Sequence, residues 1–75
     1  MAEQDPRLEN VAKELAQFPE AVLQQYQVAM GKVQTLLSTE DLFAWADQGA
    51  AMARHSVRSW EAATEYFTAS AEVLP

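Results

Sequence analysis

His55 is the only histidine of the chain and stands directly before Ser56, with Asp47 two helical turns upstream. Histidine beside a hydroxyl and a carboxylate is the residue set of a hydrolytic nucleophile and its base. However, no glycine-bounded turn exposes a nucleophile, and no loop offers the backbone donors of an oxyanion hole. We therefore expect His55 to lie on the polar flank of a helix, near its C-terminal end, where it complements the helix dipole.

Glu61 and Glu65 stand one helical turn apart, a spacing that can hold a metal ion in a helical bundle. Such sites pair glutamate with histidine in a Glu-x-x-His pattern, and His55 is too far along the chain to complete one. The two glutamates are therefore expected on a solvated face beside Arg58. The chain also lacks cysteine, a phosphate-binding loop and a dinucleotide-binding fingerprint.

These residues predict no catalytic, metal or cofactor site, and the chain is not expected to be an enzyme. The alternative is a small metal-binding or hydrolytic protein that uses His55 with nearby carboxylates. The two hypotheses differ in whether His55→Ala removes an activity.

The charge and hydropathy of the chain indicate which classes of partner to expect. The 75 residues carry 11 acids against 5 bases, a net charge of −6. Nucleic acids and anionic membranes attract clustered Lys and Arg, so neither is an expected partner. No apolar stretch approaches the roughly 18 residues that cross a bilayer, and the first residues lack the regions of a signal peptide. We expect a cytoplasmic protein that binds another protein or a second copy of itself.

The composition favours helices, because 14 residues are alanine and 7 are glutamine, which are good helix formers, whereas only 2 are glycine and 3 are proline. Asp5 before Pro6 is typical of a helix start, and Ser38 with Asp41 approximates a capping box. Ser70 is expected to cap a fifth helix that begins at the end of the chain. The four preceding helices are expected at 6–18, at 19 or 20 to 37, at 39–55, and from a cap at Ser56 or Ser59 to 69.

The helix at 39–55 has the widest apolar arc, about half of its circumference, so contact with both the second and the fourth helix is expected. Gly49 lies at the centre of this arc, where another backbone can approach closely. Gly31 is expected to point outward, and Val57 is expected to face inward. Most aromatic side chains should be core, with Tyr66 beside a partner groove. The candidates for packing or partner contact are Trp45, Gly49, Met52, Trp60, Tyr66 and Phe67.

Residues 42–70 carry a recognisable spacing. Trp45 is followed by Gly49, a small or apolar residue at 52 or 53, Ser56, an alanine pair, the aromatic pair Tyr66 and Phe67, and a closing Ser70. This resembles the helical region that precedes the von Willebrand factor A domain in bacterial CoxE, NorD and CbbO-type proteins, which work with MoxR-type AAA+ ATPases. The resemblance implies a helical-repeat scaffold in the maturation or metal-centre activation of a client enzyme. Tetratricopeptide-like hairpins, which have related spacings, remain an alternative.

We predict an all-α fold of four helices, arranged as two antiparallel helical hairpins that form either a helical repeat or an irregular four-helix bundle. Residues 1–75 are expected to form a single all-helical domain, either free-standing or the N-terminal part of a longer helical-repeat protein. The predicted function is that of a non-catalytic protein-interaction module or scaffold, which binds its partner through the outer edges of the second and fourth helices.

Overall fold

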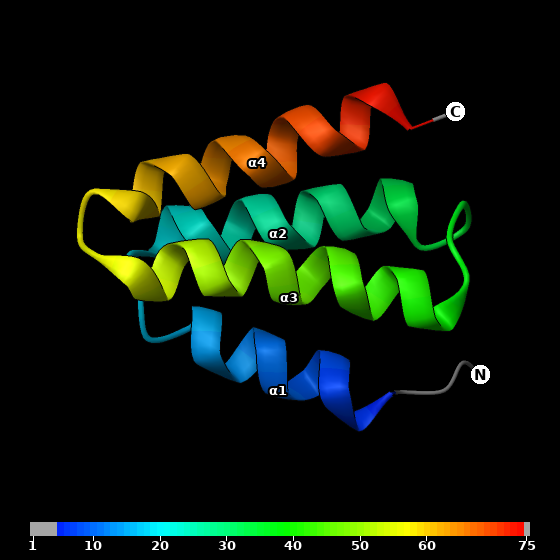
Figure 1. Cartoon of the computed structure of the whole chain (residues 1–75), viewed down its shortest axis with the longest axis horizontal. Coiled ribbons are helices and arrows are strands. Elements are labelled where there is room, and N and C mark those ends of the chain that lie inside the picture. Colours follow the sequence, from blue (N-terminus) through cyan, green and yellow to red (C-terminus); the bar gives the residue numbers. More distant parts are fainter. Residues whose placement is uncertain (1–4, 75) are drawn as a thin grey trace.

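The computed structural model describes residues 5–74, and this part of the chain contains four helices and no strand. The helices are α1 (Pro6–Leu15), α2 (Glu20–Val33), α3 (Thr39–His55) and α4 (Ser59–Val73). Consecutive helices run in opposite directions, so α1 lies parallel to α3 and α2 lies parallel to α4 (Figure 1). The predicted all-α fold of antiparallel hairpins is confirmed. Within residues 5–74, no helix is long and apolar enough to cross a membrane.

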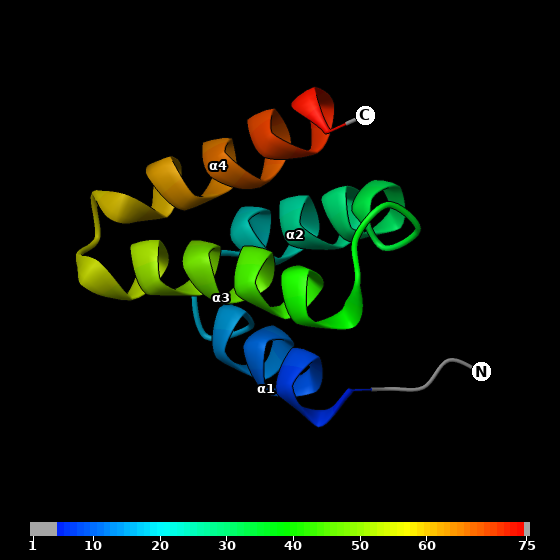
Figure 2. The same cartoon turned by 45° about the vertical axis from the view of Figure 1, so that its right-hand side comes forward.

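The two hairpins stack side by side. The α4 helix packs against both α2 and α3, whereas α1 packs mainly on α3 and touches α2 only lightly. In both views α1 lies on the side of α3 opposite α4 (Figures 1 and 2). The predicted contact of α3 with α4 is present, but its other close neighbour is α1 rather than the predicted second helix. The α2 helix reaches α3 through Tyr26, whose ring stacks on Trp45 with centroids 5.9 Å apart.

Two helices begin as their sequences predict. The Asp5 carboxylate accepts a hydrogen bond from the Arg7 backbone N–H at 2.9 Å, with Pro6 in the first helical position. At the start of α3, the Ser38 hydroxyl accepts the backbone N–H of Asp41 at 3.1 Å. Each cap satisfies a backbone donor that the first turn leaves without a helical partner. As a result, α3 spans the predicted residues.

The start of α4 differs from the prediction. Arg58 occupies the N-cap position without a side-chain hydrogen bond, so neither Ser56 nor Ser59 acts as the cap. Their two hydroxyls lie 3.3 Å apart instead. Residues 56–58 form a short turn between α3 and α4, and Val57 is 67% exposed there rather than buried.

Three predicted helix ends are also wrong. The α1 helix ends at Leu15 rather than 18, because the chain tightens into a turn before Pro19 and the Phe18 N–H bonds back three residues to Leu15. The α2 helix ends at Val33 rather than 37. No fifth helix begins at Ser70, because α4 continues to Val73; Pro75 lies outside the described residues.

All four helices contribute to one hydrophobic core. On α3 the buried positions are mostly small, so α4 can lie close against it. Gly31 points outward as predicted, and no atom lies within 4 Å of where its Cβ would be. The buried hydrophobic residues are Val11, Leu15, Val22, Tyr26, Ala29, Val33, Leu42, Trp45, Ala46, Ala50, Ala53, Ala63, Phe67 and Ala71.

Ion pairs join α1 to α3 near both ends. Arg7 bridges Asp5 at 3.0 Å and Glu40 at 3.1 Å where the two helices begin. Where they end, the Arg54 guanidinium donates two hydrogen bonds to the Glu14 carboxylate, from Nε to Oε2 at 2.6 Å and from Nη2 to Oε1 at 2.9 Å. These hydrogen bonds hold the pKa of the Glu14 carboxyl below its ordinary value.

Candidate functional site

Four aromatic side chains gather where α2, α3 and α4 meet, and we call Tyr26, Trp45, Tyr66 and Phe67 the aromatic cluster. Phe67 lies at its centre and is completely buried. Its ring centroid lies 5.3 Å from those of Tyr26 and Trp45 and 5.4 Å from that of Tyr66. The tilted and edge-on angles of these pairs are those that aromatic quadrupoles favour.

Gly49 is the contact point for this cluster on α3. A Cβ at Gly49 would lie 2.1 Å from Cζ and 2.3 Å from Cε1 of Phe67. The close approach predicted at Gly49 is therefore present, but the approaching group is an aromatic ring from α4 and not a backbone. The ring fills the space that the missing side chain leaves.

Two hydrogen bonds fix the edges of the cluster. The Trp45 indole N–H donates to the Ser70 hydroxyl at 2.8 Å, and the Tyr66 hydroxyl donates to the Trp45 carbonyl at 2.8 Å. Burial raises the pKa of Tyr26 to about 12 and raises that of Tyr66 above its ordinary value, so both phenols are neutral at pH 7. The arrangement holds α3 against α4 and offers no group poised for chemistry.

The hydrogen bonds of the Ser70 hydroxyl explain why no new helix begins at this residue. Its hydroxyl donates to the Tyr66 carbonyl at 2.5 Å in its own helix and accepts the indole N–H. Serine in a helix often bonds to the carbonyl four residues before it.

Replacing Ser70 with alanine is expected to lower the free energy of unfolding by about 1–2 kcal/mol, because the half-buried indole N–H of Trp45 loses its partner. Urea denaturation monitored by circular dichroism measures the change. The matched control is Ser59→Ala, whose hydroxyl contacts only exposed Ser56. Equal losses in the two variants would show that the indole bond contributes nothing.

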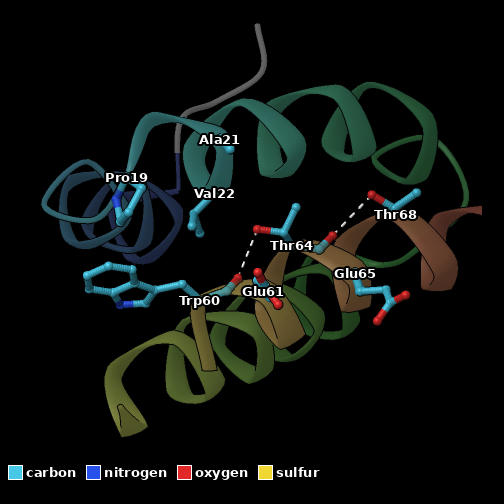
Figure 3. A pocket seen from close by; sticks show the side chains of 8 residues that line it. All are labelled: Pro19, Ala21, Val22, Trp60, Glu61, Thr64, Glu65 and Thr68. Atoms are coloured by element: carbon cyan, nitrogen blue, oxygen red, sulfur yellow. Dashed lines mark hydrogen bonds between the residues drawn. The ribbon is translucent and has the colours of Figure 1, made fainter. Parts of the chain in front are cut away.

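A shallow groove lies between α2 and α4, near the end at which both helices begin (Figure 3). Val22, which is buried, lies at its base, and Trp60 extends from α4 toward Pro19. The Trp60 ring is half-buried and packs on Phe18, with centroids 6.1 Å apart. The residues that line the groove are Pro19, Ala21, Val22, Trp60, Glu61, Thr64, Glu65 and Thr68.

The groove has two chemically different walls. Pro19, the N-cap of α2, and Ala21 and Val22 in its first turn form an apolar wall, whereas the α4 wall carries the exposed carboxylates of Glu61 and Glu65. The groove is open to solvent on the side away from the core, so it can accept part of another molecule without any movement of the helices.

The candidate residues thus separate into two places. Trp45, Gly49, Tyr66 and Phe67 meet in or beside the aromatic cluster, and half-buried Met52 packs against the core. Only Trp60 lines the groove, and Tyr66 lies on the side of α4 that faces α3.

The residues considered for catalysis are not brought together around a reaction centre. His55 ends α3 with an exposed side chain, and Glu61 and Glu65 lie on the rim of the groove. Within residues 5–74, no three histidine, aspartate or glutamate side chains gather as a metal site would require.

The sequence predicts a binding surface on the outer edges of the second and fourth helices, but it does not single out Pro19, Ala21 or Thr68 as residues of that surface. One usable signal was the spacing of Trp60, Thr64 and Thr68, which places two threonines and an indole on a single stripe of α4. The contribution of Pro19 and Ala21 depends on how α2 lies against α4, and no local pattern reports that.

Comparison with known proteins finds no matching family model, curated protein or solved structure. The resemblance of residues 42–70 to the helical region of CoxE, NorD and CbbO-type proteins therefore stays a prediction. What the structure adds is where these residues lie: Trp45, Gly49, Tyr66, Phe67 and Ser70 form one set of contacts between α3 and α4.

Proposed function

We propose that this protein is a cytoplasmic, non-catalytic interaction module that binds a protein partner through the groove between α2 and α4. The observation that carries the proposal is a half-exposed tryptophan in an open groove whose base is apolar. Tryptophan is enriched among the residues that dominate binding energy at protein interfaces, particularly where it sits in a pocket. The groove lies along the helix edges that the sequence predicts to face a partner.

The side chains of the groove support binding rather than catalysis. The hydroxyl of Thr64 donates to the Trp60 carbonyl at 2.9 Å, and that of Thr68 donates to the Thr64 carbonyl at 3.0 Å. A hydroxyl nucleophile needs a neighbouring base to take its proton, and here the acceptors within hydrogen-bond distance are backbone carbonyls and the amide oxygen of Gln25, which are weak bases. The groove can recognise a surface, but its hydroxyls are not activated.

The resemblance of residues 42–70 supports a narrower form of the proposal, in which the module is a scaffold for enzyme maturation assisted by a MoxR-type ATPase. In this form the aromatic cluster supplies the rigid scaffold, while the groove supplies the contact with the ATPase or its client. A second copy of the chain is the other partner that the sequence predicts.

Filling the groove tests the proposal without changing its charge. Ala21 is exposed on the α2 wall, so Ala21→Tyr places a ring in the groove without disturbing the core. We expect this variant to lose at least about tenfold in affinity for a partner captured from the native organism and then purified, because the partner can no longer reach Trp60. Isothermal titration calorimetry with the purified partner measures the change.

The matched control is Ala69→Tyr, which adds the same ring to an exposed position of α4 that does not line the groove. This variant is expected to bind like the original protein. Failure to recover any protein partner across several salt concentrations, or equal binding by the two tyrosine variants, would rule out the groove as the binding surface.

A further inference from the structure

The polar atoms of the groove are almost entirely hydrogen-bond acceptors. Glu61 and Glu65 present carboxylates, which accept only. The Thr64 hydroxyl donates its proton to the Trp60 carbonyl, and the single proton of the Thr68 hydroxyl is shared between the Thr64 carbonyl at 3.0 Å and the Gln25 side-chain oxygen at 2.9 Å. Apart from these two hydroxyls, the indole N–H of Trp60 is the one side-chain donor among the lining residues. A ligand that satisfies this surface must bring donors.

The charge of the groove agrees with its hydrogen-bonding character. In the part of the chain that the structure describes, the ion pairs of Arg7 and Arg54 involve Asp5, Glu40 and Glu14 and leave out both groove glutamates. Among the described residues, the carboxylates of Glu61 and Glu65, which line the groove on its α4 side, therefore have no cation within ion-pair distance. Trp60 beside them adds an aromatic face, which attracts Lys and Arg groups through its quadrupole.

Because one wall of the groove is apolar and the other is acidic, a peptide bound between them must present different side chains to each wall. Glu61 and Glu65 are separated by about 6 Å of helix rise. In an extended peptide, side chains two residues apart lie on the same side with a spacing of about 6.5 Å, and the residue between them points the other way. A peptide along the groove can thus direct alternate residues toward the acidic α4 wall and the rest toward Pro19 and Ala21.

From these observations we propose that the α2/α4 groove binds an extended basic segment of a partner protein, in which Lys or Arg alternates with apolar residues. The basic residues pair with Glu61 and Glu65, and the apolar residues lie against Pro19, Ala21 and Val22. This inference rests on the proposed interaction function and adds the chemistry of the partner.

For one of the two glutamates, Glu61, stabilisation of the helix dipole is by itself a sufficient reason for an acidic residue at that position. Glu61 lies in the first turn of α4, where an acidic side chain complements the positive end of the helix dipole. Glu65 lies a full turn farther along, where this effect has largely decayed. Glu65 is therefore the cleaner residue to change.

The probe is a capped peptide of sequence Arg-Leu-Arg-Leu-Arg, titrated into the isotopically labelled protein and followed by NMR chemical shifts. We expect Glu65→Gln to weaken binding about two- to fivefold, as for one exposed ion pair, and the Glu61→Gln, Glu65→Gln double variant to weaken it about tenfold. Glu9→Gln removes the same charge from an exposed position on α1 and is expected to leave binding unchanged.

Two further peptides separate pattern from charge. Arg-Arg-Arg-Leu-Leu has the same composition without the alternation, and Glu-Leu-Glu-Leu-Glu reverses the charge; both are expected to bind more weakly. Equal affinity for the alternating and the acidic peptide, or an equal loss in Glu9→Gln and Glu65→Gln, would overturn the inference. A natural partner that is lost with Ala21→Tyr but retained by the double variant would also overturn it, while leaving the interaction function intact.

Discussion

Replacing Gly49 with alanine is expected to lower the free energy of unfolding by about 2 kcal/mol, although Gly→Ala inside an exposed helix ordinarily raises it by about 1 kcal/mol. The new Cβ would lie 2.1 Å from Cζ of Phe67. The Phe67 ring has no free space into which to retreat, because it is fully buried among Tyr26, Trp45 and Tyr66. Gly49→Leu adds more atoms to the same space, and a loss greater than about 2 kcal/mol is expected.

Gly31→Ala is the matched control for this prediction. Gly31 is exposed in the last turn of α2, and apart from its chain neighbours and its own helix backbone nothing lies within 4 Å of its missing Cβ. Alanine there is expected to raise the free energy of unfolding by about 1 kcal/mol. Chemical denaturation of both variants measures the two changes, and the expected result is opposite signs. An increase in stability for both would show that Phe67 can move aside, and that the α3–α4 contact is looser than its geometry indicates.

Replacing Phe67 with alanine is expected to cost about 3–5 kcal/mol, the largest effect in the molecule. The ring contacts three other aromatic side chains and fills the space above Gly49, so its removal leaves a cavity that the surrounding helices cannot close. A domain of this length is stable by only about 4–11 kcal/mol in total. A large part of the stability should therefore disappear, with a lowered urea midpoint and a weaker near-ultraviolet circular dichroism signal.

Val28→Ala provides the comparison for Phe67→Ala, because Val28 lies on α2 with 56% of its surface exposed. Its expected change is within about 0.5 kcal/mol. If Phe67→Ala were no more destabilising than Val28→Ala, the aromatic cluster would not be the contact that holds α3 and α4 together.

Local signals predicted most of the fold. Ser38 is followed by acids and then by an apolar period, and these features lie within a few residues of one another. The result is a helix α3 whose bounds agree with the prediction. The same holds for the start of α1, where Asp5 and Pro6 act on the backbone immediately after them. Capping is a short-range interaction, so a single sequence is sufficient to recognise it.

The failures involve residues whose surroundings come from elsewhere in the chain. Ser70 looks like a helix cap on its own, but its hydroxyl donates to the Tyr66 carbonyl within α4 and accepts the indole N–H of Trp45 from α3, 25 residues earlier. Gly49 was correctly recognised as a point of close contact, yet the group that fills the space is Phe67, 18 residues away. Periodicity shows that a face is buried and does not identify what covers it.

The groove shows the same limit. The sequence identifies Trp60 as a candidate and the outer edges of the second and fourth helices as a binding surface. It does not show that Ala21 and Glu65 line the same groove, because that depends on the register between α2 and α4. The Gln25–Thr68 hydrogen bond, between residues 43 apart, records that register and appears in no local pattern.

The attachment of α1 has a consequence for how the molecule opens. The exposed ion pairs at its two ends weaken as salt screens them, and α1 touches α2 only lightly. The helices α2, α3 and α4 are joined to one another by the aromatic cluster, which salt does not weaken. Amide hydrogens of α1 should therefore exchange with solvent through local unfolding while those of the other three helices remain protected. Such an exchange pattern would show that α1 opens first, although Val11 and Leu15 join it to the common core, and that the groove between α2 and α4 stays folded when it does.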